Sequence, residues 1–227
     1  MATKTKSKKM TDAQEWELVA NKVKNNAEEL AALTSHAELF RWSRDNELDK
    51  PWLFKKFKAE LFKQLDIKYD ELRDAAVAAR KAEIAAEAGN GPQITLFCAG
   101  DAEANSFAIC DAEGGVLWYA DFHREDRIAK ADDQLSADLS AADKAVFLAG
   151  KVREDAEAPA GRLRLTVSNH EISAERLAVA AVKARLQVEV EISDGDNPAL
   201  EWCREAGSKS WREVRLRDLV DSPEDTQ

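Results

Sequence analysis

The feature that most constrains this chain is the string Gly89-Asn90-Gly91-Pro92, where the spacing of apolar residues changes. Glycine and proline in this combination are typical of a loop, because both interrupt regular secondary structure. Before the string, apolar residues recur at helical spacing, and after it they form short runs typical of strands. The sequence therefore predicts a helical domain over residues 11–88, a hinge over 89–93 and an α/β domain over 94–220.

The ends of the chain are polar, and we expect residues 1–10 and 221–227 to be disordered tails. The first tail is basic and lacks the apolar stretch that a secretory signal needs. Cys98, Cys110 and Cys203 include no C-x-x-C pair, which favours a reducing, cytoplasmic location. The chain contains no run of about 18 apolar residues, so the sequence predicts no membrane span.

Apolar residues in the first part recur at the spacing of amphipathic helices. Thr11 is suited to cap the first of these helices, and Pro51 is suited to the first turn of a later one. The expected helices cover about 11–33, 36–44, 51–65 and 69–88. The last is rich in Ala, Arg and Glu, which favours a connecting helix or one strand of a coiled coil.

Charge is distributed unevenly along the chain. The net charge is −10, yet residues 1–68 hold 14 Lys and Arg against 11 Asp and Glu, while the remainder holds 19 against 32. Because Lys and Arg neutralise phosphates, nucleic acid is expected to bind the helical part of the chain rather than the acidic remainder.

The expected helix over 51–65 places lysines between aromatic residues. One interpretation is a site for nucleic acid or a protein partner, in which the lysines make the contacts. The alternative is an ordinary amphipathic helix with a buried aromatic face and solvated lysines. The candidate binding residues are Lys55, Lys56, Lys58 and Lys63.

The second part alternates strands and helices. Strands are expected over 93–98, 106–111, 116–122, 162–167 and 188–192. Helices are expected from Ser140, as the capping residue, to about Glu157, from Ser173 to Leu186, and from Asn197 to Glu205.

This order of elements resembles the ribonuclease H fold over residues 93–206. The segment Ser106–Trp118 is similar to the family's second and third strands. The segment Asn197–Glu201 looks like its last-helix element, in which a carboxylate follows an Asn by four residues. The resemblance implies a mixed five-stranded sheet with helices for this part of the chain. Together with the helical N-terminal segment, the expected fold is of the α+β or α/β class.

The resemblance also implies a candidate metal site. Enzymes of this family gather about four carboxylates around two divalent metals, which stabilise the attacking and leaving oxygens of a phosphodiester. The implied positions depart from the family pattern, because Ala99 stands where the first Asp is expected. The implied metal ligands are Asp101, Asp143, Asn169 and Glu201, and the catalytic carboxylates among them are Asp101, Asp143 and Glu201.

Three functions are consistent with these features. The leading hypothesis is a non-catalytic nucleic-acid-associated or assembly protein, whose helical part binds nucleic acid or a protein and whose α/β domain mediates docking or homo-oligomer formation. The first alternative is a metal-dependent nuclease of the ribonuclease H type, with magnesium or manganese as its cofactor. The second is an acidic protein that blocks a partner's nucleic-acid-binding surface. No cofactor and no membrane contact are expected otherwise.

Overall fold

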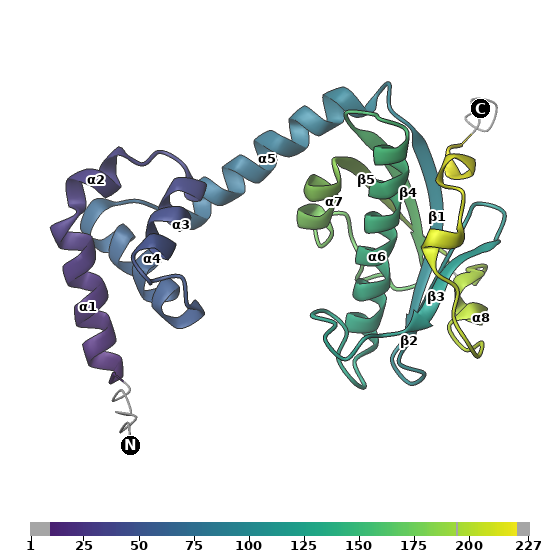
Figure 1. The fold of residues 1–227 in the computed structure, drawn as a ribbon, viewed down its shortest axis with the longest axis horizontal. Helices are drawn as coiled ribbons and strands as arrows, with labels where there is room; N and C mark the ends of the chain where they lie inside the picture. Colours follow the sequence, from purple (N-terminus) through teal and green to yellow (C-terminus); the bar gives the residue numbers. More distant parts are fainter. Residues whose placement is uncertain (1–9, 194, 222–227) are drawn as a thin grey trace, which may run out of the picture. The chain divides into compact units, whose positions relative to one another are not determined.

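The computed structural model describes residues 10–193 and 195–221, shown as a ribbon in Figure 1. Most of both expected tails therefore lies outside the described residues. The chain divides into two compact units, residues 1–79 and residues 80–227. This division falls within helix α5 (Tyr69–Ala88) rather than at the glycine-rich hinge, because Ile84 and Ala88 pack against Ala160 of the second unit.

The first unit is helical. Its helices are α1 (Asp12–Asn25), α2 (Ala27–Ala32), α3 (His36–Asp45), α4 (Pro51–Leu65) and the first part of α5. Thr11 and Ser35 begin α1 and α3 with capping boxes, in which each side chain accepts a backbone amide that the helix leaves free. The single helix expected over 11–33 is a wrong prediction. The helix is interrupted at Asn26, whose side-chain amide donates to the carbonyl of Lys22.

The core of the helical unit is aromatic. Trp42 of α3 stacks on Phe57 of α4, with ring centroids 5.5 Å apart. Phe54, also of α4, meets Tyr69 edge to face at 5.1 Å. Leu39 and Leu61 complete the same buried cluster. The aromatic face predicted for the helix over 51–65 is therefore partly a core face, as the amphipathic interpretation required.

The second unit contains a five-stranded mixed sheet with the order β3-β2-β1-β4-β5. Strand β1 pairs antiparallel with β2 and parallel with β4, while β3 and β5 are the outer strands. This arrangement is compatible with a ribonuclease-H-like domain. The strands are β1 (Gln93–Asp101), β2 (Ser106–Cys110), β3 (Val116–Asp121), β4 (Gly161–Val167) and β5 (Leu186–Ile192).

Helices cover both faces of the sheet (Figure 1). Helices α6 (Gln134–Asp155) and α7 (Ala178–Ala184) lie on one face, and α8 (Ala199–Trp202) lies on the other. Alternate residues of β1 follow this division. Leu96 and Cys98 belong to the main core beneath α6, whereas Phe97 and Ala99 face α8.

Three expected helices have different bounds in the structure. Helix α8 covers only Ala199–Trp202 of the residues expected from Asn197 to Glu205. Helix α6 begins at Gln134, capped by the side chain of Asp133, so Ser140 is an interior residue of the helix and not its cap. Helix α7 is limited to Ala178–Ala184, because residues 174–177 form turns and Leu186 already belongs to β5. No helix in the described part of the chain is long and apolar enough to cross a bilayer.

Candidate functional site

Polar side chains meet where β1 and β4 end. These strands are parallel, so their carboxyl ends lie side by side, and the chain leaves them in opposite directions across the sheet. Such a point is the usual position of a binding site in an open α/β sheet. The residues that reach it come from β1, from the loop after β4 and from the first turns of α6.

Asp138 of α6 is the central carboxylate of this junction. Its Oδ1 accepts the backbone amide of Gly100 at 3.1 Å. Its Oδ2 accepts the side-chain amides of Asn169 at 2.9 Å and of Gln134 at 3.0 Å. Gln134 also donates to the carbonyl of Gly100 at 2.8 Å and accepts the amide of Ala102 at 3.1 Å. Both side chains therefore fasten the start of α6 to the end of β1.

The other side of β1 is fastened by Asn197, which is buried. Its side-chain amide donates to the carbonyl of Cys98 at 2.9 Å and to Oγ of Ser168 at 3.2 Å. Its carbonyl oxygen accepts the amide of Ala199 at 3.0 Å, at the start of α8. Asn197 thus joins β1, the end of β4 and α8, which is a structural use of the Asn in the predicted last-helix element.

Asp101 lies on the α8 side of β1 and is engaged in hydrogen bonds. Its Oδ1 accepts the amides of Glu103 and Ala104, both at 2.9 Å, and its Oδ2 accepts Nε of Arg204 at 3.0 Å. The hydrogen bond from the Ala104 amide, together with Arg204, lowers the pKa of Asp101 below its usual value. The carboxylate therefore closes a turn after β1 and anchors Arg204, two residues after the end of α8.

The structure does not bring the four predicted metal ligands together. Asn169 contacts Asp138, and Asp143 lies further along α6, lining a hollow between α6 and α7. Burial raises the pKa of Asp143. Glu201 is exposed on α8. Within residues 10–193 and 195–221, no group of His, Cys, Asp or Glu side chains is arranged to hold a metal ion.

Asp138 and Gln134 were not predicted as site residues. They are four residues apart, which places both side chains on one face of a helix. The sequence does not show this pair, because it predicts that the helix begins at Ser140, downstream of both residues. A helix start at Asp133 would have placed this pair beside the end of β1.

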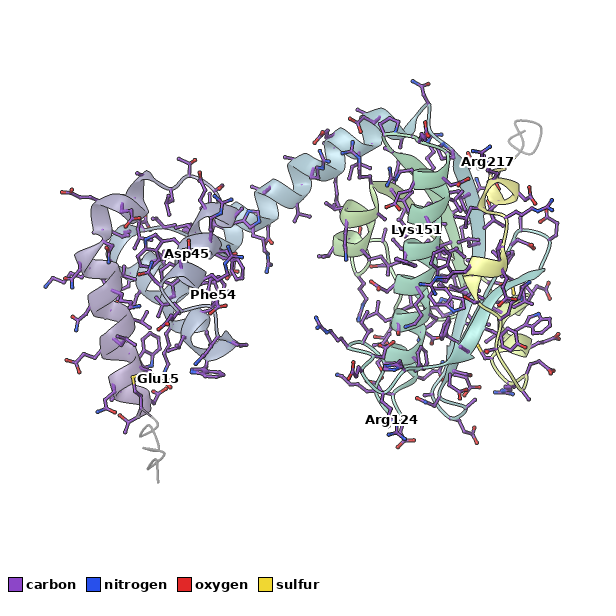
Figure 2. The ribbon with its side chains drawn as sticks, in the orientation of Figure 1. Glu15, Asp45, Phe54, Arg124, Lys151 and Arg217 are labelled. Atoms are coloured by element: carbon purple, nitrogen blue, oxygen red, sulfur yellow. The ribbon has the colours of Figure 1, made fainter. Side chains whose placement is uncertain are left out.

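The four lysines predicted as binding residues differ in whether their ammonium groups are free to contact a ligand. Lys56 is buried, and its ammonium pairs with Asp12 at 2.5 Å and with Glu15 at 2.6 Å; Glu15 is labelled on α1 in Figure 2. Lys58 pairs with Asp70 at 2.9 Å. Both residues are therefore used within the helical unit, and the prediction that they contact a ligand has no support from their geometry.

The remaining two lysines belong to an exposed stripe that we call the α4 face. Trp52 and Phe62 are 53% and 54% exposed, the highest values among the exposed Trp and Phe side chains of the described residues. Within the described residues, Lys55 has no charged partner, and Lys63 approaches only Glu60, at 3.5 Å. An open hollow of about 600 Å³ adjoins Trp52 and Lys55. The α4 face consists of Trp52, Lys55, Ala59, Phe62 and Lys63.

Comparisons with protein-family models, curated proteins and solved structures find no match to this chain.

The three cysteines are buried thiols in the α/β unit. Burial raises the pKa of Cys98, and it raises the pKa of Cys110 and of Cys203 to about 12, so thiolate is scarce at neutral pH. We expect a thiol reagent such as dithionitrobenzoate to modify all three only when the unit unfolds. Mass spectrometry of the native and urea-unfolded chain checks this. Rapid modification of any single cysteine in the native chain would contradict it.

Proposed function

We propose that this chain is a non-catalytic adaptor protein that binds an acidic surface of a partner protein through the α4 face. The observation that carries the proposal is the exposure of Trp52 and Phe62 on one side of a helix whose opposite side is a well-packed core. Large aromatic side chains are enriched among the residues that dominate protein interfaces. Lys55 and Lys63 beside them favour an acidic partner surface.

The junction between β1 and β4 supports a binding role over a catalytic one. A two-metal nuclease needs carboxylates whose oxygens meet the metals. Here Asp101 and Asp138 accept hydrogen bonds from the protein with both of their oxygens. Asp143 lines a different hollow, and Glu201 is exposed on α8. The hydrogen bonds of the junction hold the ends of β1 and β4 to the start of α6. The junction therefore stabilises the fold.

Nucleic acid is a second candidate ligand for the same face. The ammonium of Lys50 lies 5.8 Å from the ring centre of Trp52, which is itself exposed. A stacking aromatic residue with cations beside it is the usual platform for an unpaired base. Against this, two of the four predicted lysines are committed to Asp12, Glu15 and Asp70 within the unit.

The test compares the intact chain with the double variant Trp52→Ala, Phe62→Ala. We expect the double variant to retain its helical structure, because both side chains are exposed, and to lose binding to its partner by tenfold or more, about 1.4 kcal/mol at least. Affinity purification from the source cell, quantified by mass spectrometry, identifies proteins that depend on the α4 face. The affinity of each identified protein is then measured with both chains by calorimetry.

A matched control is Val179→Ala, which removes a 75% exposed apolar side chain from the second unit. The control should bind like the intact chain. Fluorescence anisotropy with a single-stranded oligonucleotide at low salt examines the second candidate ligand. Binding of the oligonucleotide that is lost in the double variant would favour nucleic acid, and equal partner binding by the double variant would contradict the adaptor proposal.

A further inference from the structure

Strand β5 is the last strand of the sheet, and one of its edges is unpaired. It pairs with β4 along its whole length, from Leu186 opposite Gly161 to Ile192 opposite Val167. No segment in the described part of the chain pairs with its other edge. The strand contains no proline and no bulge, two of the devices that keep a sheet edge from pairing. It does carry two charged residues, Glu189 and Glu191, which disfavour an acidic neighbour and favour a basic one.

Two hydrogen bonds fix which backbone groups face outward. Gly161 donates to the carbonyl of Arg185 at 3.1 Å, and Ser193 donates to the carbonyl of Val167 at 2.9 Å. Because backbone groups alternate in direction along a strand, the odd-numbered residues between Arg185 and Ser193 also point toward β4. The amides and carbonyls of the even-numbered residues therefore point away from the sheet. They belong to Leu186, Val188, Val190 and Ile192.

The opposite edge of the sheet is protected by the chain itself. Tyr119 of β3 and Lys209 exchange two backbone hydrogen bonds, at 3.0 and 3.2 Å. The Lys209 ammonium also donates to the carbonyl of Val116. One outer strand is thus capped by a segment after α8, while β5 has no such cap among the described residues.

The side chains of β5 define what would fit beside it. Leu186, Val188 and Val190 face the core under α6 and α7. On the other face Glu189 and Glu191 are exposed; Glu191 pairs with Arg164 at 3.2 Å, and Glu189 has no charged partner in the described part. An added strand would therefore meet an apolar row on one face and a carboxylate row on the other.

We propose that the free edge of β5 binds an extended segment of a partner protein in which lysine or arginine alternates with β-branched residues. The even-numbered backbone groups supply the hydrogen bonds, as in other cases of strand addition. The basic side chains lie beside Glu189 and Glu191, and the β-branched ones continue the row of Val188 and Val190. This surface belongs to a different unit from the α4 face, so each proposal is tested without the other.

A second copy of the chain fits the edge less well. Two antiparallel β5 strands would place glutamates of one copy beside glutamates of the other, and like charges at such positions repel. Sedimentation of the full chain tests this occupant directly. A dimer that Glu189→Lys strengthens would replace the basic segment as the occupant and overturn the proposal.

The probe is a fluorescent peptide of alternating lysine and valine, about seven residues long, titrated against the full chain and read by anisotropy. We expect saturable binding that Glu189→Lys weakens about tenfold, because an attraction becomes a repulsion. Glu205→Lys is the matched control, since it makes the same charge change at another exposed position of the unit. Equal weakening by both variants would mean that only net charge attracts the peptide, and would overturn the proposal.

The backbone contribution is tested with N-methylated peptides. A strand presents alternate amides to its neighbour, so methylating one alternate set should abolish binding and methylating the other set should preserve it. Loss with both sets, or with neither, would overturn pairing at the edge. The Trp52→Ala, Phe62→Ala variant should bind the peptide like the intact chain, which separates this result from the fate of the α4 face.

Discussion

Replacing Gly100 by alanine is expected to destabilise the α/β unit by about 3 kcal/mol or more. A Cβ atom at this position would lie 2.3 Å from the carbonyl carbon and 2.4 Å from the oxygen of Ala137. Both are backbone atoms of α6, so no side-chain rotation relieves the clash. The helix and β1 would have to separate, and the hydrogen bond from the Gly100 amide to Asp138 would lengthen with them.

The measurement is urea unfolding monitored by amide hydrogen exchange in peptides from β1 and β4, which follows the α/β unit separately from the helical unit. Gly89→Ala is the matched control. A Cβ there meets the flexible end of Arg162 at 3.7 Å and the carbonyl oxygen of Ala86 at 4.0 Å, which are both ordinary contacts, so a change within about 0.5 kcal/mol is expected. If the two alanine variants lose equal stability, the close approach of α6 to β1 is not what Gly100 provides.

The positions of the strands along the chain are accessible from the sequence because each strand carries a local signal. The apolar run 93–98 predicts a buried strand, the glycine-rich turn after Asp111 predicts a hairpin of the next two strands, and the alternation at Val188–Ile192 predicts a fifth strand. Five strands lie close to these positions. Local patterns identify elements well when burial on one face imposes the alternation directly.

The start of α6 could not be predicted from the sequence, because it depends on contacts with other segments and not on a local pattern. Ser140 has the chemistry of a capping residue, yet in the structure its hydroxyl lies inside the helix and donates to Asp126 at 2.9 Å. That use depends on a loop far from Ser140 in sequence. The same holds for Asp138, whose partners come from β1 and from the loop after β4. A site assembled from three segments leaves only single polar residues in the sequence, and many such residues are merely solvated.

The charge pattern shows that the α4 helix is rich in lysine, but it does not show which of these lysines are free to bind a ligand. The sequence predicts all four lysines of α4 as binding residues, although Lys56 turns inward to Asp12 and Glu15 while Lys55 faces outward. Helical spacing alone places these neighbours on different sides, but it does not say which side meets the core. Tertiary packing decides that, so the sequence overestimated the cationic surface of the helix.

Lys144→Met should also destabilise the α/β unit, by about 3 kcal/mol near neutral pH. The Lys144 ammonium donates to Asp126 at 2.5 Å and to Ser140 at 2.7 Å, and it lies 5.0 Å from the ring centre of Phe107. The Asp126 side chain is only 10% exposed. Methionine keeps the length of the side chain but leaves that carboxylate without its cation.

Lys151→Met is the matched control. Lys151, labelled on α6 in Figure 2, pairs with the exposed Glu154, so this substitution should cost about 0.5 kcal/mol or less.

Acid should reduce the cost of Lys144→Met. Burial alone would raise the pKa of Asp126, but hydrogen bonds from Lys144 and from the amides of Ala129 and Ile128 outweigh it and hold the pKa at about 2. A carboxyl group with a lowered pKa in the folded chain stabilises the fold above its ordinary pKa, and this contribution is lost as the pH falls through the folded value. Without Lys144 the carboxylate takes up a proton earlier and is relieved of its unpaired charge. The difference in unfolding free energy between the intact chain and the variant should therefore shrink as the pH falls from about 5 to about 2, through the ordinary and the folded pKa of this carboxyl group. A difference that stays constant over this range would mean that lost packing against Phe107, and not the buried charge pair, accounts for the destabilisation.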